Sequence, residues 1–471
     1  MQIVVYFNTI GEYDMKKTAK FGGSSVANAN QIKKLTNIVK NDKDIRAIVV
    51  SAPGKRFKAD IKVTDLLINL YKDYKQDSPS YINSLEKIIL RYEDIARDLG
   101  LDLGLVDSFK EILISFLENI DDDFYLENAI KSAGEDFNAR LIAAYLEKVG
   151  LKAKYISPKD LGIRLEYSLN DAKILDVSYD LIKKYEDCKE ILVIPGFFGY
   201  NDEGYRLTFS RGGSDITGSM VARGLSCDIY ENYTDMTYIY SANPNVFYNP
   251  APIKNISYAE MRELSYNGFE IFQEDAVQPL LNTNIEIHVK NTNNPDEGGT
   301  IISKDRTDIS ENPIIGISDV GAFTSFTLTE YMMNRKIGYI KNVLDIFQYM
   351  HIAVEHIPTS IDSVSILVRS SYIKDKSRKL SIINAINSSF DLDELDLNDR
   401  LKAIAIVGEG LKDKMSKALY IFSKVLDDIN VNIEYIIQGA SNNSLFIFID
   451  KDDEDKSLKA LYKSIYEEES L

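Results

Sequence analysis

The stretch KFGGSSV, residues 20–26, places a lysine, two glycines and two serines in succession. Glycine lets backbone N–H groups approach a phosphate closely because it has no Cβ. A helix that begins near Ser25 would direct its free N–H groups and its positive dipole end at the same anion. Lys20 would add a point charge. The alternative is a plain strand-to-helix turn, because short glycine motifs are non-specific and a P-loop places its lysine after the glycines.

Composition describes a globular chain. The 471 residues are 45% hydrophobic and 27% charged, with a formal net charge of −17. This length predicts about two to four domains. The acidic balance argues against nucleic acid and anionic membranes as general partners, because both attract basic patches. No stretch reaches the roughly 18 apolar residues that a membrane helix needs.

Cysteine and histidine usage favours a cytoplasmic protein without a dedicated metal site. Cys188 and Cys227 are the two cysteines, too few for a disulfide framework, so a reducing cytoplasm is the expected compartment. His288, His351 and His356 are not spaced as metal ligands. We therefore expect these histidines to be ordinary core or surface residues.

The first 14 residues are expected to form an N-terminal extension. Residues 1–14 lack the basic start and the small-residue cleavage site of a signal peptide. We expect them to lie outside the fold, with an edge strand at Ile3–Phe7 as the alternative. Residues 15–19 would form the strand that delivers Lys20.

Strand-like and helix-like segments then alternate, which predicts a doubly wound α/β sheet. Continuous apolar runs are typical of buried parallel strands, and helical spacing marks the segments between them. The expected strands are Ile45–Ser51, Lys152–Ser157 and Ile191–Pro195. The expected helices are Asn28–Asn41 and Phe137–Val149, with a helical block from Tyr71 to about Ile130.

Polar residues near the predicted helix starts have two interpretations. Thr64 is a plausible N-cap, and Ser132 with Glu135 fits the S-x-x-E capping box before the helix at Phe137–Val149. The functional interpretation is that they lie, with Ser51, near strand ends, where open α/β sheets bind ligands. The pattern alone leaves both open.

A second glycine-rich loop reads Ser210-Arg211-Gly212-Gly213-Ser214-Asp215 and opens the helical segment Ile216–Ala222. Arg211 offers a planar fork suited to a carboxylate or phosphate. Asp215 could simply cap the helix, because an acidic side chain is favourable at a helix start. Two such loops, each with a cation, are harder to explain as structural turns than one.

Together these segments resemble the aspartate kinases of the amino acid kinase fold. The matching pieces occur in the family's order and extend from residue 15 to the C-terminus. They are KFGGSSVA, VVSAPGK with VTDLL, SAGE, IPGFFG, SRGGSD, TDMTYIYSANP, ISYAEMRELSYNG, VGEG and QGASNNS. No single piece is specific, but their ordered combination is.

The resemblance implies transfer of the ATP γ-phosphoryl group to the side-chain carboxylate of L-aspartate, giving 4-phospho-L-aspartate. This reaction would open the synthesis of lysine, threonine and methionine, and of diaminopimelate in many bacteria. Phosphoryl transfer needs mostly positioning and charge neutralisation from the protein. A carboxylate is already ionised at neutral pH, so a strict general base is unnecessary. Mg²⁺ is expected with ATP, held mainly by phosphate oxygens and water.

The resemblance also implies residue roles. Lys20 would neutralise the transferring group, and Asp215 would orient Lys20 or the metal-bound phosphate. Arg211 would bind the α-carboxylate of aspartate and Glu135 its ammonium. The other implied substrate-binding residues are Ser51, Thr64, Gly212, Gly213 and Ser214. The implied ATP-binding residues are Lys20, Phe21, Gly22, Gly23, Ser24, Thr234, Asp235 and Tyr240.

Two positions depart from the family pattern near the nucleotide. Many members have D-P-R where this chain has Asn243-Pro244-Asn245, and Glu270 stands where a lysine is usual. Both changes remove a cation expected near the phosphates. Lys55, Arg56 or Lys58 could supply the missing charge.

The last third predicts two small α+β repeats of the ferredoxin-like βαββαβ type, which resemble paired ACT domains. The first would comprise Ala322–Thr329, Ile337–Tyr349, Ile352–Ile357, Val364–Val368 and Lys374–Ser388. The second would comprise Ala403–Val407, Met415–Asp428, Val431–Ile437, Leu445–Ile449 and Asp453–Tyr466. The expected domains are 15–305 for the kinase, 313–390 for the first repeat and 400–471 for the second, which would share the strand Ile314–Ser318.

ACT domains of this family bind amino-acid effectors and dimerise, which implies a homo-oligomer, either a dimer or a dimer of dimers. An effector needs a carboxylate cradle and an ammonium acceptor, and Glu355 could accept the ammonium or be a solvated charge. The resemblance points to Met333, Gly338, Tyr339, Ala353, Val354, Glu355, Thr359 and Ser360 as effector-binding residues. Lysine is the first expected effector and threonine the second. No homoserine dehydrogenase domain follows residue 471, so a monofunctional enzyme is expected.

Two other functions remain open. One is a kinase of the same fold for another substrate, such as glutamate or carbamate, which SRGGSD and the tandem repeats disfavour. The other is an amino-acid-binding regulatory protein whose kinase half has decayed at Asn245 and Glu270. Against decay, the residues implied for catalysis and substrate binding are retained, namely Lys20, Glu135, Arg211 and Asp215.

Overall fold

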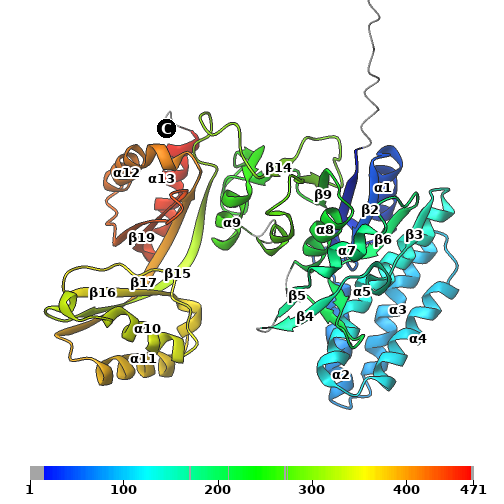
Figure 1. Cartoon of the computed structure of the whole chain (residues 1–471), viewed down its shortest axis with the longest axis horizontal. Helices are drawn as coiled ribbons and strands as arrows, with labels where there is room; N and C mark the ends of the chain where they lie inside the picture. Colours follow the sequence, from blue (N-terminus) through cyan, green and yellow to red (C-terminus); the bar gives the residue numbers. More distant parts are fainter. Residues whose placement is uncertain (1–14, 169–170, 211, 270–271, 273, 468–471) are drawn as a thin grey trace, which may run out of the picture. The chain divides into compact units, whose positions relative to one another are not determined.

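The computed structural model describes residues 15–168, 171–210, 212–269, 272 and 274–467 (Figure 1). The chain divides into two compact units. The first comprises residues 1–239, 252–258 and 271–306, and the second comprises 240–251, 259–270 and 307–471. Within the described residues, no helix is long and apolar enough to cross a membrane.

The first unit is built on an eight-stranded sheet with the order β12-β14-β13-β9-β1-β2-β6-β3. All neighbours are parallel except β13 and β14. The strands are β1 (Lys17–Phe21), β2 (Ile45–Val50), β3 (Ala153–Tyr155), β6 (Ile191–Pro195), β9 (Ile229–Thr234), β12 (Asn255–Ser257), β13 (Glu286–Asn291) and β14 (Thr300–Ser303). The predicted doubly wound α/β sheet is thereby confirmed.

Helices cover both faces of this sheet. The side chains of Ala19 and Phe21 from β1 join one buried core with α1, α3, α4 and α5, whereas α8 packs on the opposite face against β1, β2 and β9. The helices of the first unit are α1 (Ala29–Asn41), α2 (Val63–Lys75), α3 (Tyr81–Asp98), α4 (Gly104–Asn119), α5 (Asp123–Lys148), α6 (Pro158–Leu161), α7 (Val177–Lys183) and α8 (Gly213–Gly224). The result is a three-layer α/β/α arrangement.

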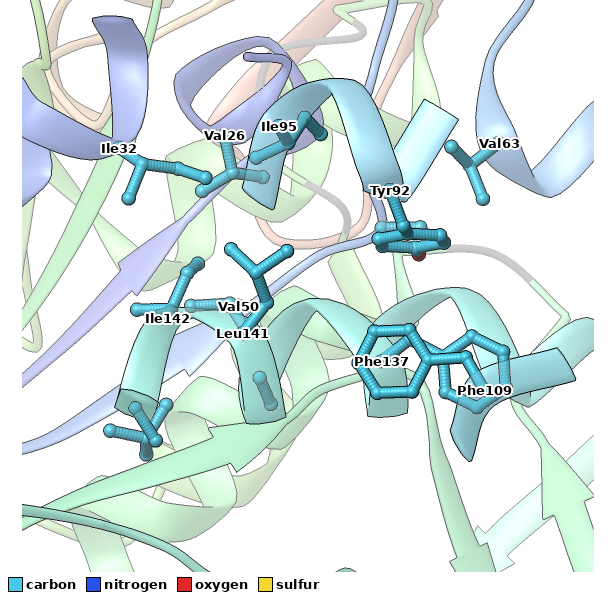
Figure 2. Close-up of a cluster of buried hydrophobic side chains, with 14 of the residues drawn as sticks. Val26, Ile32, Val50, Val63, Tyr92, Ile95, Phe109, Phe137, Leu141 and Ile142 are labelled. Carbon is cyan, nitrogen blue, oxygen red and sulfur yellow. The ribbon is translucent and has the colours of Figure 1, made fainter. Parts of the chain in front are cut away.

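The core between the sheet and α3–α5 contains stacked aromatic rings (Figure 2). Phe109 and Phe137 lie parallel with ring centroids 4.4 Å apart, and Tyr92 meets both rings edge-on. Tyr92 also donates a hydrogen bond of 2.7 Å to the Gly134 carbonyl. This packing fixes the middle of α5, which carries Glu135.

Two hairpins complete the first unit. They are β4 (Leu165–Ser168) with β5 (Asp171–Ile174), and β7 (Phe198–Tyr200) with β8 (Arg206–Thr208). The second hairpin ends just before the glycine-rich loop at 210–215. Because β8 lies against α5, it connects that loop with the helix of Glu135.

In this unit the structure corrects one expected helix start and excludes the capping alternative for Thr64 and for Ser132 with Glu135. The helix expected near Ser25 is a single 3-10 turn, Gly23–Val26, and α1 begins only at Ala29 with Asn28 as its cap. Thr64 is the second residue of α2 rather than its N-cap, which is Lys62. Ser132 and Glu135 lie in the middle of α5, so no helix begins there and they form no capping box.

The second unit contains a five-stranded antiparallel sheet with the order β16-β15-β17-β19-β18. Its strands are β15 (Gly316–Thr329), β16 (Ser363–Arg369), β17 (Glu394–Val407), β18 (Tyr435–Gln438) and β19 (Ser444–Asp450), and its helices are α9 (Tyr258–Tyr266, from Ala259 on), α10 (Tyr339–Tyr349), α11 (Lys376–Ser389), α12 (Leu411–Asp428) and α13 (Glu454–Tyr466). Among the described residues, three buried apolar clusters lie on this sheet. One lies under α10 and α11, one lies under α12 and α13, and the third contains strand residues such as Phe323, Leu367 and Phe448.

The two repeats meet in the long strands β15 and β17. Residues 316–319 of β15 pair with 404–407 of β17, whereas 323–329 pair with both β16 and the first half of β17. The segment expected as a separate strand at 314–318 is therefore continuous with the next one. The boundaries 15–305, 313–390 and 400–471 stay predictions.

Two strand predictions in this unit need correction. Ile352–Ile357 is not a regular strand, because only an isolated bridge joins His356 to Leu367 there. The first half of β17, from Glu394, was missed because polar residues interrupt its apolar pattern. It supplies the last strand of the first repeat.

Candidate active site

Three side chains meet at the centre of the large sheet. Lys20 on β1 lies opposite Asn232 on the neighbouring strand β9, and both point to the face that α8 covers. The Lys20 Nζ atom lies 2.6 Å from Asp215 Oδ1, at the start of α8. The Asn232 amide donates to the same Asp215 oxygen at 2.8 Å and accepts from Lys20 at 3.3 Å. A buried cation is thus held at a defined point between two loops.

The sequence prediction named Lys20 and Asp215 but missed Asn232. The signal was an amide within the otherwise apolar and aromatic strand β9, since Asn232 is only 3% exposed. A buried amide must find partners. Its partners depend on the pairing of β1 with β9, which the local pattern does not specify.

The first glycine-rich loop is anchored at both ends. The Gly22 N–H donates to the Tyr233 carbonyl at 3.0 Å, and the Gly54 N–H donates to the Gly23 carbonyl at 2.9 Å. A Cβ on Gly54 would stand 2.7 Å from the Gly23 backbone, so this approach requires glycine. The 3-10 turn at 23–26 leaves its first N–H groups without partners inside the turn, and the side chain of Ser24 is exposed beside them. These donors fit a phosphate.

Phe21 has a structural position. Its side chain is fully buried and stacks on the Tyr233 ring with centroids 4.7 Å apart. The implied ATP contact of Phe21 is therefore restricted to its backbone.

Glu135 presents a carboxylate beside the end of β2. The residue is only 5% exposed, and its Oε2 atom has no hydrogen-bond partner. Burial raises the pKa of Glu135 to about 8, although backbone N–H groups of Ala52 and Glu135 itself partly offset this. A buried carboxyl oxygen without a hydrogen-bond partner is costly. It fits a ligand that brings its own cation, such as an ammonium group.

Neighbouring residues hold α5 against the end of β2. Asn138 donates to the Ser51 carbonyl at 2.6 Å. A Cβ on Gly134 would stand 2.8 Å from the Ala52 Cβ, so glycine allows α5 to approach here. Ser51 and Glu135 are thereby brought to one place. Thr64 sits half-buried in the first turn of α2, whose Val63 N–H donates to the Pro53 carbonyl.

The second glycine-rich loop forms the start of α8. Gly212 has a φ of 57° and accepts from the Asp215 N–H at 2.8 Å, which turns the chain into the helix. Gly213 lets the loop pass Phe197, because a Cβ there would stand 2.7 Å from the Phe197 ring. Ser214 is buried against Gly196. Arg211 lies outside the described residues, so its role stays a prediction.

The structure describes the residues implied for nucleotide binding less fully than those implied for catalysis. Thr234 ends β9 and donates to the exposed Asp235 at 3.1 Å. Tyr240 belongs to the second unit and Glu270 lies outside the described residues, so both roles stay predictions. In the second unit, the Asn245 N–H donates to the Asn243 side chain.

Of the three candidate replacement cations, one is already neutralised. Arg56 binds Asp60 with two hydrogen bonds of 2.9 and 3.1 Å. Lys55 and Lys58 are exposed. In the part of the chain that the structure describes, no cluster of three or more His, Cys, Asp or Glu side chains could hold a metal ion.

The predicted effector residues lie in two segments of the second unit. Met333 is buried in a 3-10 turn, Gly338 precedes α10 with a φ of 78°, and the buried Tyr339 hydroxyl has no partner. The turn is hydrogen-bonded to residues 361–362, close to the second segment. That segment contains Ala353, Val354, Glu355, Thr359 and Ser360, of which Ala353, Thr359 and Ser360 are exposed.

Glu355 is already engaged. Its carboxylate accepts from Arg369 at 3.1 Å and from the Tyr266 hydroxyl at 2.7 Å. A second carboxylate that the sequence prediction did not name, Glu330, pairs with Lys336 and keeps its buried Oε2 atom without a partner. The two segments and Glu330 beside them thus offer two carboxylates, and each already has a cationic partner, Arg369 for Glu355 and Lys336 for Glu330.

Comparison with known proteins agrees with this architecture. Residues 15–291 match the model of the amino acid kinase family, and residues 404–465 match an ACT domain model. The fold and site define an amino acid kinase. The chain is 38% identical over 452 residues to Aspartokinase 3 of Bacillus subtilis strain 168, an alignment that covers 96% of this chain and 98% of that protein.

Solved structures give the same result. The aspartate kinase of Clostridium acetobutylicum shares 32% identity and a TM-score of 0.83, over 95% of this chain and 99% of that one. Aspartokinase III of E. coli with aspartate and ADP, at 21% identity and a TM-score of 0.74 over 95% and 99%, has the same fold. The chain belongs to the aspartate kinase family, and the predicted family and enzyme class are confirmed.

Proposed function

We propose that the enzyme transfers the γ-phosphoryl group of ATP to the side-chain carboxylate of L-aspartate and that its ACT repeats bind an amino acid that inhibits this reaction. The observation that supports the transfer is the pairing of Lys20 with Asp215 between the two glycine-rich loops. The Lys20 Nζ atom would stand only 3.6 Å from a Cβ on Gly22, the residue before the 3-10 turn, so a phosphate bound to the turn would be within reach of the lysine. The product, 4-phospho-L-aspartate, would enter lysine, threonine, methionine and diaminopimelate synthesis.

Lys20 acts by charge in this proposal. Phosphoryl transfer spreads negative charge over the transferred oxygens, and a fixed cation in a site with little water stabilises that charge. Asp215 and Asn232 hold the Lys20 ammonium in place before ATP binds. Mg²⁺, held by phosphate oxygens and water, would neutralise further phosphate charge. The aspartate side chain is ionised at neutral pH and needs no base.

Glu135 supplies recognition of the substrate. The unpartnered Oε2 atom of its buried carboxylate accepts a hydrogen bond from the ammonium of L-aspartate, while Arg211 binds the α-carboxylate. The two groups would orient the substrate with its side chain toward Lys20. An otherwise similar acid without an ammonium group would leave Glu135 buried and unpaired, and so would bind more weakly.

Lysine is the proposed effector, with threonine second. A structure of E. coli aspartokinase III contains lysine and aspartate, which supports lysine as the first choice. In the proposed site Glu355 and Glu330 offer carboxylates to the effector's ammonium groups near the start of α10. An effector shifts the enzyme only by binding one state better than another. We also propose that the enzyme is a homo-oligomer joined through its ACT repeats and that it works in the cytoplasm.

A coupled assay tests these proposals together. ATP turnover is measured with L-aspartate or L-glutamate, and then with added L-lysine or L-threonine. Turnover that depends on aspartate and is suppressed by lysine supports the reaction and the effector. Equal turnover with glutamate would favour another amino acid kinase. Binding of lysine by calorimetry without any turnover would favour the decayed regulatory protein.

A further inference from the structure

Helix α5 lacks the amphipathic stripe that usually fixes how a helix is rotated. Its buried residues between 126 and 146 lie on every side, including the polar Asn128, Ser132, Asp136 and Asn138. A helix that is apolar on one face turns that face to the core. A helix that is buried on all sides has no such preference. Polar contacts must therefore fix its rotation about its axis and its position along that axis.

Those contacts join α5 to β8. Asn128, Ser132 and Asp136 follow at intervals of four and therefore share one face of the helix. The Asn128 side chain accepts from the backbone N–H and the hydroxyl of Thr208, both at 2.8 Å. Arg206, on the same strand, donates to Ser132 at 3.0 Å and to Asp136 at 2.9 Å. One guanidinium thus donates hydrogen bonds to α5 residues that precede and follow Glu135 in the sequence.

The contacts of Arg206 with α5 are largely buried. Asp136 is fully buried and also accepts from Arg140 at 3.1 Å and from the Tyr155 hydroxyl at 2.5 Å. Burial alone would raise the pKa of Asp136, but the charges of Arg206 and Arg140 outweigh it and hold the pKa below its usual value. The Arg206 guanidinium also lies over three aromatic rings, those of Phe116, Phe198 and Tyr200.

A buried ion pair is weak evidence for stability, because apolar residues of the same volume often serve as well. Its advantage is geometric specificity, since the planar guanidinium can donate to partners only in a narrow range of positions. Arg206 also stands five residues before Arg211 in the sequence. The same hairpin therefore leads to the group proposed for the α-carboxylate of the substrate.

We propose that Arg206 is a positioning residue. Through its hydrogen bonds to Ser132 and Asp136 it orients Glu135 to bind the ammonium group of L-aspartate. This inference rests on the proposed role of Glu135. Without these hydrogen bonds α5 can rotate about its axis or shift along it, and Glu135 no longer faces the end of β2. The expected cost falls on recognition of the ammonium group and not on the nucleotide.

The test compares the variants R206M and E135Q in the full-length enzyme. The readouts are KM for L-aspartate, KM for ATP, and the inhibition constant of succinate, which has both carboxylates but no ammonium group. For R206M we expect KM for L-aspartate to rise about tenfold, because a shift of about 1 Å in a positioning contact has large effects. The succinate constant and KM for ATP should change by less than about twofold, because neither ligand uses Glu135.

The matched control is R223M. Arg223 lies 3.9 Å over the Tyr179 ring and donates to the Pro279 carbonyl at 3.0 Å, so it is also a packed arginine, but at the far end of α8. R223M should leave all three constants unchanged. If R206M does not fold, R206K takes its place, and a smaller rise in KM for L-aspartate alone is expected because the charge remains without the fork.

Two results would overturn the inference. One is an unchanged KM for L-aspartate in a folded R206M or R206K enzyme. The other is an equal rise for L-aspartate, succinate and ATP, which would indicate a general loss of structure. An E135Q enzyme with unchanged KM for L-aspartate would instead remove the proposed role of Glu135 itself. The two failures are therefore distinguishable.

Discussion

Lys20 and Asp215 form a contact of 2.6 Å between the first strand of the sheet and the start of α8, although 195 positions separate them in the sequence. The lysine is 7% exposed. A cation in such a place cannot reorganise freely. Electrostatic stabilisation is strongest when the charge is already in position and little water competes with it. The Lys20–Asp215 pair therefore marks the position at which the transferred phosphoryl group would be stabilised.

Replacement of Lys20 with methionine should abolish most of the transfer. We expect kcat to fall by about 10²–10³ or more, because one fixed charge at the transferred group is lost. KM for L-aspartate should change little, since Glu135 recognises the substrate elsewhere. Steady-state kinetics measure both constants, and a K20M enzyme with a kcat near that of the wild type would refute the role of the lysine.

Asn232 should matter although no motif contains it. N232A removes the amide that joins Lys20 to Asp215, so the lysine loses a fixed position while the charge stays. We expect kcat to fall by about 10–100-fold, the range seen when a hydrogen bond that orients a metal ligand is removed. The control is T18V, because Thr18 is buried on β1, the strand of Lys20, and contacts the Cys227 sulfur at 3.3 Å. Equal kcat values for N232A and T18V would speak against the prediction.

The carboxyl of Glu135 should make aspartate binding depend on pH. Its pKa is raised to about 8 in the free enzyme, and it must be ionised to accept an ammonium. We expect kcat/KM for L-aspartate to rise with pH up to about 8 and then level off, and the E135Q enzyme to lose this dependence. A profile for E135Q that is parallel to that of the wild type would contradict the assignment.

The same group should affect stability in the opposite sense. Its folded pKa is about 8 against a usual value of 4.5, so between these values the folded chain binds more protons than the unfolded chain. Stability therefore falls as pH rises through this window. E135Q cannot ionise, and its Tm should decline less from pH 5 to pH 8 than that of the wild type, as thermal unfolding would show. An identical decline would exclude Glu135 as the cause.

Tyr266 should tune the proposed effector site. Its hydroxyl donates to Glu355, so an effector ammonium must compete with it. Y266F removes one competitor and should strengthen effector binding about two- to tenfold, the range of a typical hydrogen bond. E355A should weaken it instead. Calorimetry with lysine and with threonine measures both, and an unchanged affinity in both variants would place the effector elsewhere.

Features that depend on the local sequence were predicted better than features that depend on tertiary contacts. The buried strands and the glycine turn at 20–26 are short-range features, so their places were predictable. The S-x-x-E pattern at Ser132 misled because the same spacing also fits the interior of a helix, and α5 is buried on all sides and carries no stripe to mark its start. Asn232 and Arg206 were missed because their roles come from strand pairing and helix packing.

The most direct test of the central claim is the product itself. An acyl phosphate reacts with hydroxylamine, so 4-phospho-L-aspartate can be trapped as a hydroxamate. The account predicts ATP-dependent hydroxamate from L-aspartate, far less from L-glutamate, and almost none in a D215N enzyme that still binds L-aspartate. Equal hydroxamate from both amino acids, or full activity in D215N, would contradict it.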